Sequence, residues 1–121
     1  MVIEGAQMTP ILEQSHTTSH VHYMAANPEP VKRFLAEHPG VTQVLLEAKK
    51  PLQDAFGKDI QVAVAVTSNP EIAAGEFLLS SIQTSLSARQ AHTRLDKFDE
   101  TWWLDNAPRV QGQLIFTVAF A

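Results

Sequence analysis

The amino-acid sequence predicts an α+β domain, and three features carry this prediction. Residues 60–67 alternate valine with glutamine, alanine and threonine, a pattern typical of an interior β-strand. Residues 77–84 read as a second strand, antiparallel to the first. A capped helix starting at Ser87 then leads to residues 114–120, which again alternate with period two. We expect a three- or four-stranded, mainly antiparallel sheet with helices packed mostly on one face.

Two helices are predicted before these strands. Asn27-Pro28 supplies an N-cap residue followed by a proline at the first helical position, and His38-Pro39-Gly40 ends the short helix. A second helix runs from Val41 to its stop at Gly57, with a kink or restart at Pro51. With a possible strand near the N-terminus, the expected order is (β)-α-α-β-β-α-β.

The helix that begins at Ser87 carries a capping box, because Gln90 stands at its third position. Its apolar residues follow helical spacing, and Asn106-Ala-Pro108 ends it. Because this helix joins two strands, the three elements form a crossover. The predicted inward-facing residues are Ala91, Leu95, Phe98 and Trp102.

The last predicted strand is unusually apolar. Leu114, Phe116, Val118 and Phe120 share one face and Ile115 lies on the other. An open sheet edge normally avoids such a strand. We therefore expect it to be central in the sheet, with pairing to a second copy in a homodimer as the alternative.

Bulk properties restrict the class of protein. The 121 residues suit one domain. Residues 1–27 form a poorly patterned segment with a possible edge strand, and residues 28–121 form a single α+β domain. The absence of cysteine excludes disulfides, a thiol nucleophile and cysteine-ligated zinc. The net charge of −4 makes a nucleic-acid partner unlikely, because such proteins need a basic surface.

Localisation follows from two further observations. No apolar stretch approaches the roughly 20 residues of a membrane span. Residues 1–10 carry Glu4 and neither lysine nor arginine, which is unlike a signal peptide. We expect a cytoplasmic protein that has no membrane contact.

The first candidate site is the histidine segment. His16, His20 and His22 lie on one side of the possible edge strand, a geometry that can hold a metal when a further ligand approaches. The competing interpretation, which we favour, is an exposed polar face. No motif elsewhere supplies the missing ligands, and we expect no cofactor.

The second candidate site is the acidic and aromatic end of the long helix. Asp99, Glu100 and Trp103 are the candidate interaction residues there. Adjacent tryptophans on an α-helix diverge by roughly 100°, so Trp103 should lie near the core boundary when Trp102 is in the core. Its indole either packs as a satellite of the core, the favoured interpretation, or anchors a partner protein.

Catalytic patterns are weak. His92 and Asp96 are four residues apart and form half of a nucleophilic triad, with no identifiable nucleophile. Asp96 or Asp99 could act in acid–base chemistry only if burial raised its pKa. The chain has neither a Gly-x-Ser-x-Gly elbow nor a glycine-rich phosphate loop.

The C-terminal half resembles a family of small uncharacterised bacterial proteins. The resemblance rests on residues 82–89, on Leu95-Asp-Lys-Phe-Asp-Glu-Thr-Trp-Trp-Leu-Asp-Asn106, and on Gly112-Gln-Leu114. It extends loosely over residues 30–121 and is specific in the Phe-Asp-Glu-x-Trp-Trp-Leu-Asp motif. It implies a bacterial cytoplasmic origin and one compact domain, and it carries no catalytic residue or cofactor.

Taken together, these patterns favour a non-enzymatic protein-interaction or accessory module that works by binding another protein. The first alternative is a small-molecule or metal binder that uses the histidine segment. The second is a small acid–base enzyme with His92 and Asp96 or Asp99 in a cleft.

Overall fold

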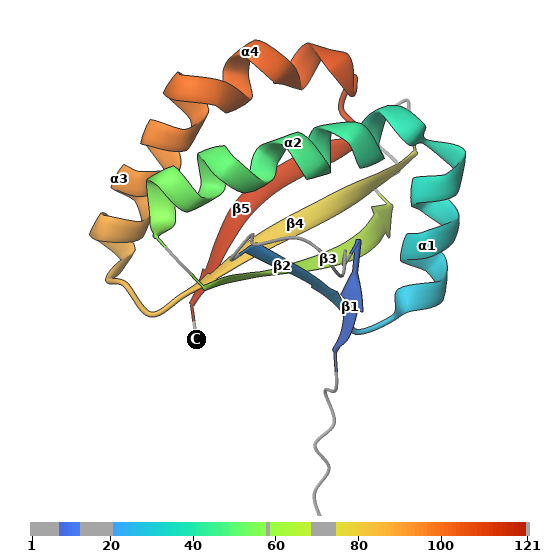
Figure 1. The fold of residues 1–121 in the computed structure, drawn as a ribbon, viewed down its shortest axis with the longest axis horizontal. Helices are drawn as coiled ribbons and strands as arrows, with labels where there is room; N and C mark the ends of the chain where they lie inside the picture. Colours follow the sequence, from blue (N-terminus) through green and yellow to red (C-terminus); the bar gives the residue numbers. More distant parts are fainter. Residues whose placement is uncertain (1–7, 13–20, 58, 69–74, 121) are drawn as a thin grey trace, which may run out of the picture.

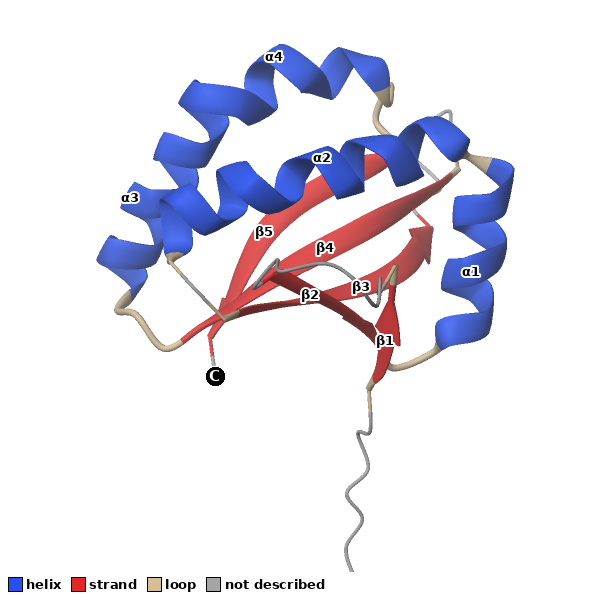
Figure 2. Ribbon diagram, in the orientation of Figure 1, coloured by secondary structure: helices blue, strands red, loops and turns tan. Residues whose placement is uncertain are grey.

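The computed structural model describes residues 8–12, 21–57, 59–68 and 75–120. These residues form one sheet with helices on one of its faces (Figures 1 and 2). In chain order the elements are β1 (Thr9–Ile11), β2 (Val21–Ala25), α1 (Pro28–Glu37), α2 (Pro39–Phe56), β3 (Ile60–Ser68), β4 (Glu76–Thr84), α3 (Ala88–Phe98), the π-helical turn η1 (Asp99–Trp103), α4 (Leu104–Asn106), the 3-10 turn η2 (Ala107–Arg109) and β5 (Leu114–Phe120). The expected α+β class is confirmed.

The sheet has five strands in the spatial order β1-β2-β3-β4-β5. Two neighbouring pairs, β1–β2 and β3–β4, are antiparallel, and the other two, β2–β3 and β4–β5, are parallel. The expectation of three or four mainly antiparallel strands was therefore wrong in strand number and in direction. The physical reason is that helices connect β2 to β3 and β4 to β5, and a helical crossover returns the chain in a parallel direction.

Two short strands near the N-terminus, β1 and β2, belong to the same sheet. β2 lies between β1 and β3, so the possible edge strand of residues 1–27 is an interior strand. Ile11, Val21 and Tyr23 are buried in the same hydrophobic core as the helices. β1 was missed because it has only three residues and contains Pro10, which gives no alternating pattern.

Most helix boundaries follow local chemistry. Pro28 begins α1 and Pro39 begins α2. Proline lacks a backbone N–H, and at the first helical position that N–H would have no acceptor within the helix. α2 continues through Pro51 to Phe56 as one helix, so the predicted restart is not observed. Gly57 ends it with a φ of 95°, a conformation that glycine adopts without strain. Ser87 and Gln90 form the predicted capping box of α3.

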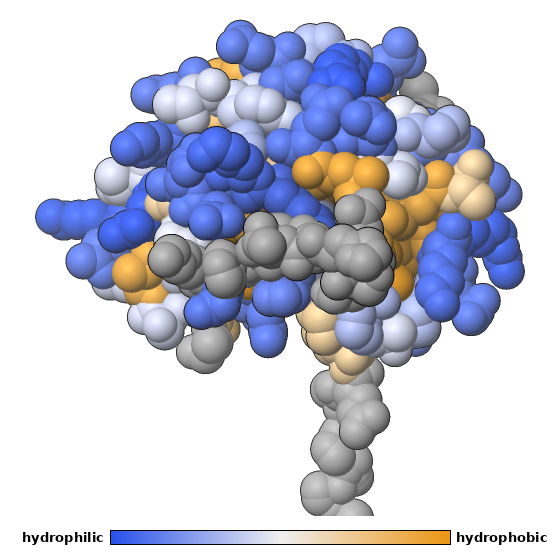
Figure 3. Space-filling view, in the orientation of Figure 1, coloured by the Kyte–Doolittle hydropathy of each residue, from blue (hydrophilic) through white to orange (hydrophobic). Residues whose placement is uncertain are grey.

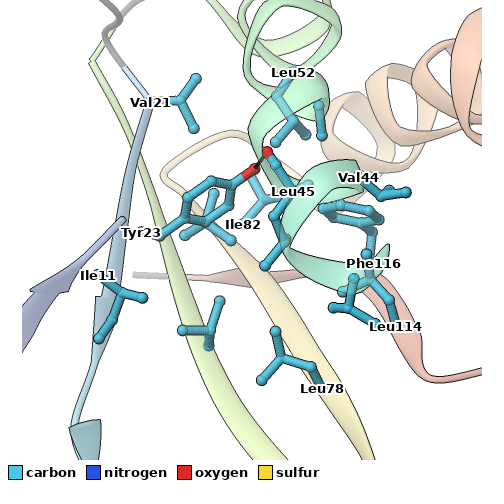
Figure 4. Packing of buried hydrophobic residues seen from close by; sticks show 14 of the residues in the cluster. Ile11, Val21, Tyr23, Val44, Leu45, Leu52, Leu78, Ile82, Leu114 and Phe116 are labelled. Carbon is cyan, nitrogen blue, oxygen red and sulfur yellow. Dashed lines mark hydrogen bonds between the residues drawn. The ribbon is translucent and has the colours of Figure 1, made fainter. Parts of the chain in front are cut away.

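The core lies between the helix layer and one face of the sheet (Figure 4). Tyr23 from β2 is almost fully buried, and its hydroxyl donates a 2.6 Å hydrogen bond to the carbonyl oxygen of Leu45 in α2. Burial raises the pKa of the Tyr23 hydroxyl, so the donor keeps its proton. This bond ties α2 to the interior of the sheet.

The outward surfaces of the helices are mostly hydrophilic in the view of Figure 3, and a patch of hydrophobic surface appears beside α1. No helix in the described part of the chain is long and apolar enough to cross a membrane.

Replacing Tyr23 with phenylalanine should lower the free energy of unfolding by about 1 kcal/mol, because a buried hydrogen bond is lost while the ring is kept. Urea denaturation measures this change. Ser80→Ala is the matched control, since the buried Ser80 hydroxyl has no hydrogen-bond partner among the described residues. That control should be neutral or stabilising. Equal losses in both variants would contradict the role assigned to the Tyr23 hydroxyl.

Candidate functional site

β5 lies at the edge of the sheet. Among the described strands it pairs only with β4, and its other edge faces away from the sheet (Figure 1). The expected central position is therefore wrong. Because β5 enters the sheet by a crossover from β4, it adds beside β4, and no later strand in the described chain follows it.

This edge lacks the features that normally prevent strand pairing. β5 is seven residues long, and its sequence, LIFTVAF, contains no charged residue and no proline. Natural edge strands are usually short, charged or interrupted by proline. Ile115 and Phe120 also leave 38% and 51% of their surfaces exposed. β5 is thus a strand edge suited to pairing with another chain.

The α3–η1 segment covers the helix-side face of β5. The Phe98 ring meets the Phe116 ring edge-on at a centroid distance of 5.1 Å, and the Trp103 ring meets the same ring at 4.9 Å. Edge-to-face pairs at such distances are favourable beyond the area that they bury. Phe116 is therefore held from two sides, and the helix is fixed over the edge strand.

The π-helical turn explains the position of the two tryptophans. The Leu104 N–H donates to the Asp99 carbonyl oxygen, five residues back, in place of the usual four. The wider turn brings the indoles of Trp102 and Trp103 into a stacked arrangement with centroids 6.2 Å apart. Both side chains are half-buried against the core. Trp103 thus packs at the periphery of the core, and its contact with Phe116 places it next to the outer edge of β5.

Asp99 lies on the β5 side of this segment. Trp102 faces α2, where it lines a groove with Pro51, whereas Trp103 faces β5. Asp99 and Trp103 are four positions apart in a turn closed by a hydrogen bond between residues five apart, and so lie close to the same side of the helix. Glu100 is exposed one position further on.

The electrostatic environment of Asp99 is unfavourable to its charge. Partial burial raises the pKa of the Asp99 carboxyl, and the nearby Asp96 and Glu100 carboxylates raise it further. Within the described residues, none of these three carboxylates forms an ion pair with a lysine or arginine. The α3–η1 segment that covers β5, called the α3–η1 roof below, therefore carries negative charge that no described lysine or arginine neutralises.

The opposite side of the same helix is different. A groove of about 360 Å³ between α2 and η1 is lined by Glu47, Lys50, Pro51, Asp54, Thr101 and Trp102. Its carboxylates already have cationic partners. Arg109 binds Glu47 through two hydrogen bonds of 2.7 and 3.1 Å and holds the pKa of that carboxyl at about 2, and Lys50 lies 3.4 Å from Asp54. This groove offers little to a cationic partner.

The histidine site is only partly inside the described structure. His16 and His20 lie outside the described residues, and His22 is a half-buried residue of β2. Because β2 is interior and not an edge strand, the expected exposed edge at this segment is wrong. Among the described residues, no group of three or more histidine, aspartate or glutamate side chains could hold a metal ion.

The candidate acid–base pair is exposed. His92 and Asp96 both lie on the solvent-facing surface of α3. A separate depression of about 260 Å³ is lined by eight residues that include Arg94, Asp59 and Thr84, but not by His92, Asp96 or Asp99. The pocket and the candidate acid–base residues are thus in different places.

The interaction role of Asp99, Glu100 and Trp103 stays a prediction, and the strand edge that Trp103 borders was not predicted from the sequence. The exposed apolar residues of that edge are Ile115 and Phe120, and Leu104 in α4 is 62% exposed. The sequence feature that could have indicated this edge is the apolar, uncharged pattern of residues 114–120, from which a central strand is predicted.

Replacing Asp99 with asparagine should stabilise the protein at pH 7 and have little effect at pH 3. The raised pKa means that the folded state holds a proton more tightly than the unfolded chain. Stability contributed by protonated Asp99 is therefore lost as the pH rises from the unfolded pKa through the folded one. Urea denaturation of both proteins at the two pH values measures the difference. A destabilised D99N protein at pH 7 would contradict this assignment.

Comparison of the chain with protein-family models, curated proteins and solved structures found no match. The resemblance of residues 30–121 to a bacterial family stays a prediction.

Proposed function

We infer that this protein is a non-enzymatic interaction module that binds another protein through the edge of β5. The observation that carries this proposal is the long, uncharged and partly exposed edge strand, Leu114–Phe120. A strand edge presents unpaired N–H and C=O groups in a fixed row, and an extended segment of a partner can pair with them.

The surroundings of the edge support a binding role. Ile115 and Phe120 provide apolar contact along the strand. The half-buried Trp103, which packs on Phe116, supplies an aromatic side chain over the helix-side face of the strand. Aromatic anchors next to a protected core are typical of protein interfaces. The domain keeps its own core without this surface, since Phe98 and Leu114 are already buried.

Affinity capture from the native host tests the proposal. Tagged wild-type protein should retain one near-stoichiometric partner, and Ile115→Lys should lose it, because the new charge stands on the pairing strand. Ala36→Lys is the matched control, since it adds the same charge on the exposed surface of α1. Mass spectrometry of the eluates measures the retained protein.

Two results would contradict the proposal. A wild-type capture with no partner would argue against the interaction function itself. A partner retained equally by Ile115→Lys would place its binding surface away from the β5 edge.

A further inference from the structure

We propose that the β5 edge binds an extended segment carrying lysine or arginine, which adds to the sheet as a sixth strand beneath the α3–η1 roof. This inference rests on the proposed function and names the chemistry of the partner. It follows from the direction of the free backbone groups, from the position of α3, and from the charges beside the edge.

The backbone of β5 divides into an inner and an outer set. The Leu78 N–H donates to the Gln113 carbonyl oxygen at 2.8 Å, so the Gln113 backbone points toward β4. Backbone direction alternates along a strand, which places the N–H groups of Ile115 and Thr117 on the inner side. The N–H groups of Phe116 and Val118 then point to the free edge, where an added strand would accept their hydrogen bonds.

A second copy of this chain does not fit this position. Paired strands lie about 4.8 Å apart, whereas packed helices need about 8–10 Å between their axes. α3 lies over β5, as the contacts of Phe98 and Trp103 with Phe116 show. Two copies paired antiparallel through β5, about a twofold axis perpendicular to the sheet, would bring their α3 helices side by side on the same face, closer than packed helices normally lie. An extended segment without a covering helix avoids this clash.

The charge beside the edge selects the side chains of the partner. Asp96, Asp99 and Glu100 gather on the segment that roofs β5, without an ion pair to any described lysine or arginine. A strand added next to β5 would direct every second side chain toward this roof. A lysine or arginine there meets the half-buried Asp99 carboxylate, whose negative charge Asp96 and Glu100 reinforce. An apolar residue two positions along meets the exposed part of Trp103.

The test uses purified protein and two synthetic peptides. The probe acetyl-Thr-Lys-Thr-Val-Thr-Lys-Thr-amide matches β5 in length and places both lysines and the valine on one face. The control peptide has glutamate in place of both lysines. The chain has two tryptophans, both in η1, so intrinsic fluorescence reports binding at this site directly. Amide chemical shifts of 15N-labelled protein map the contact.

The expected result is saturable binding of the lysine peptide with shifts centred on Phe116 and Val118, and no binding of the glutamate peptide. Asp99→Asn should weaken the affinity up to about fivefold, the range of a partly exposed charge pair. Asp54→Asn, which removes an exposed α2 carboxylate outside this surface, should leave the affinity unchanged.

Val118→Pro removes one outward N–H and leaves the hydrogen bonds to β4 in place, so it should abolish binding in a folded protein. Circular dichroism checks the fold, and if V118P does not fold, the peptide and Asp99 comparisons still decide.

Equal binding of both peptides, or no binding of the lysine peptide at millimolar concentration, would overturn the inference. Concentration-dependent dimerisation in sedimentation that V118P abolishes would assign the edge to a second copy instead. A partner captured in the cell through Ile115 would still support the proposed function.

Discussion

The packing of Phe98 and Trp103 on Phe116 is the interaction on which the architecture of the C-terminal half depends. It fixes α3 and the π-helical turn over the last strand and closes one end of the core. Because the helix contacts β5 from one face only, it stabilises the strand without occupying its outer edge. The helix side of the domain is thereby completed, while no described strand pairs with the outer edge of β5.

The position of the helix also accounts for the chemistry of that edge. The wide turn at Asp99–Trp103 directs an aromatic ring and a carboxylate toward the same side. An aromatic ring there favours apolar contact, and the clustered carboxylates favour a cation. On the other side of the helix, Arg109 and Lys50 already neutralise Glu47 and Asp54. Among the described residues, the carboxylates on the β5 side of this helix therefore lack the cationic partners that those on the α2 side have.

Local patterns in the sequence were sufficient for most individual elements. The valine alternation of residues 60–67 and the capping box at Ser87 correctly predicted β3 and α3. Strand order was not predictable, because the apolar pattern of residues 114–120 favours a central position, whereas the chain places this strand at the edge without charged residues or proline. The π-helical turn was missed because the α-helical spacing of Phe98 and Trp102 gives no sign of an inserted residue. Asp99 and Trp103 were therefore proposed as interaction residues without the strand edge beside which we now place that role.

Amide hydrogen exchange along β5 tests the central claim most directly, because it reports which backbone groups are paired. The open edge predicts alternation: slow exchange at Ile115, Thr117 and Ala119, which face β4, and fast exchange at Phe116 and Val118, which face outward. Peptide binding is not needed for this measurement. Uniform protection along the strand in the isolated protein would show that the edge is already covered and would contradict the account.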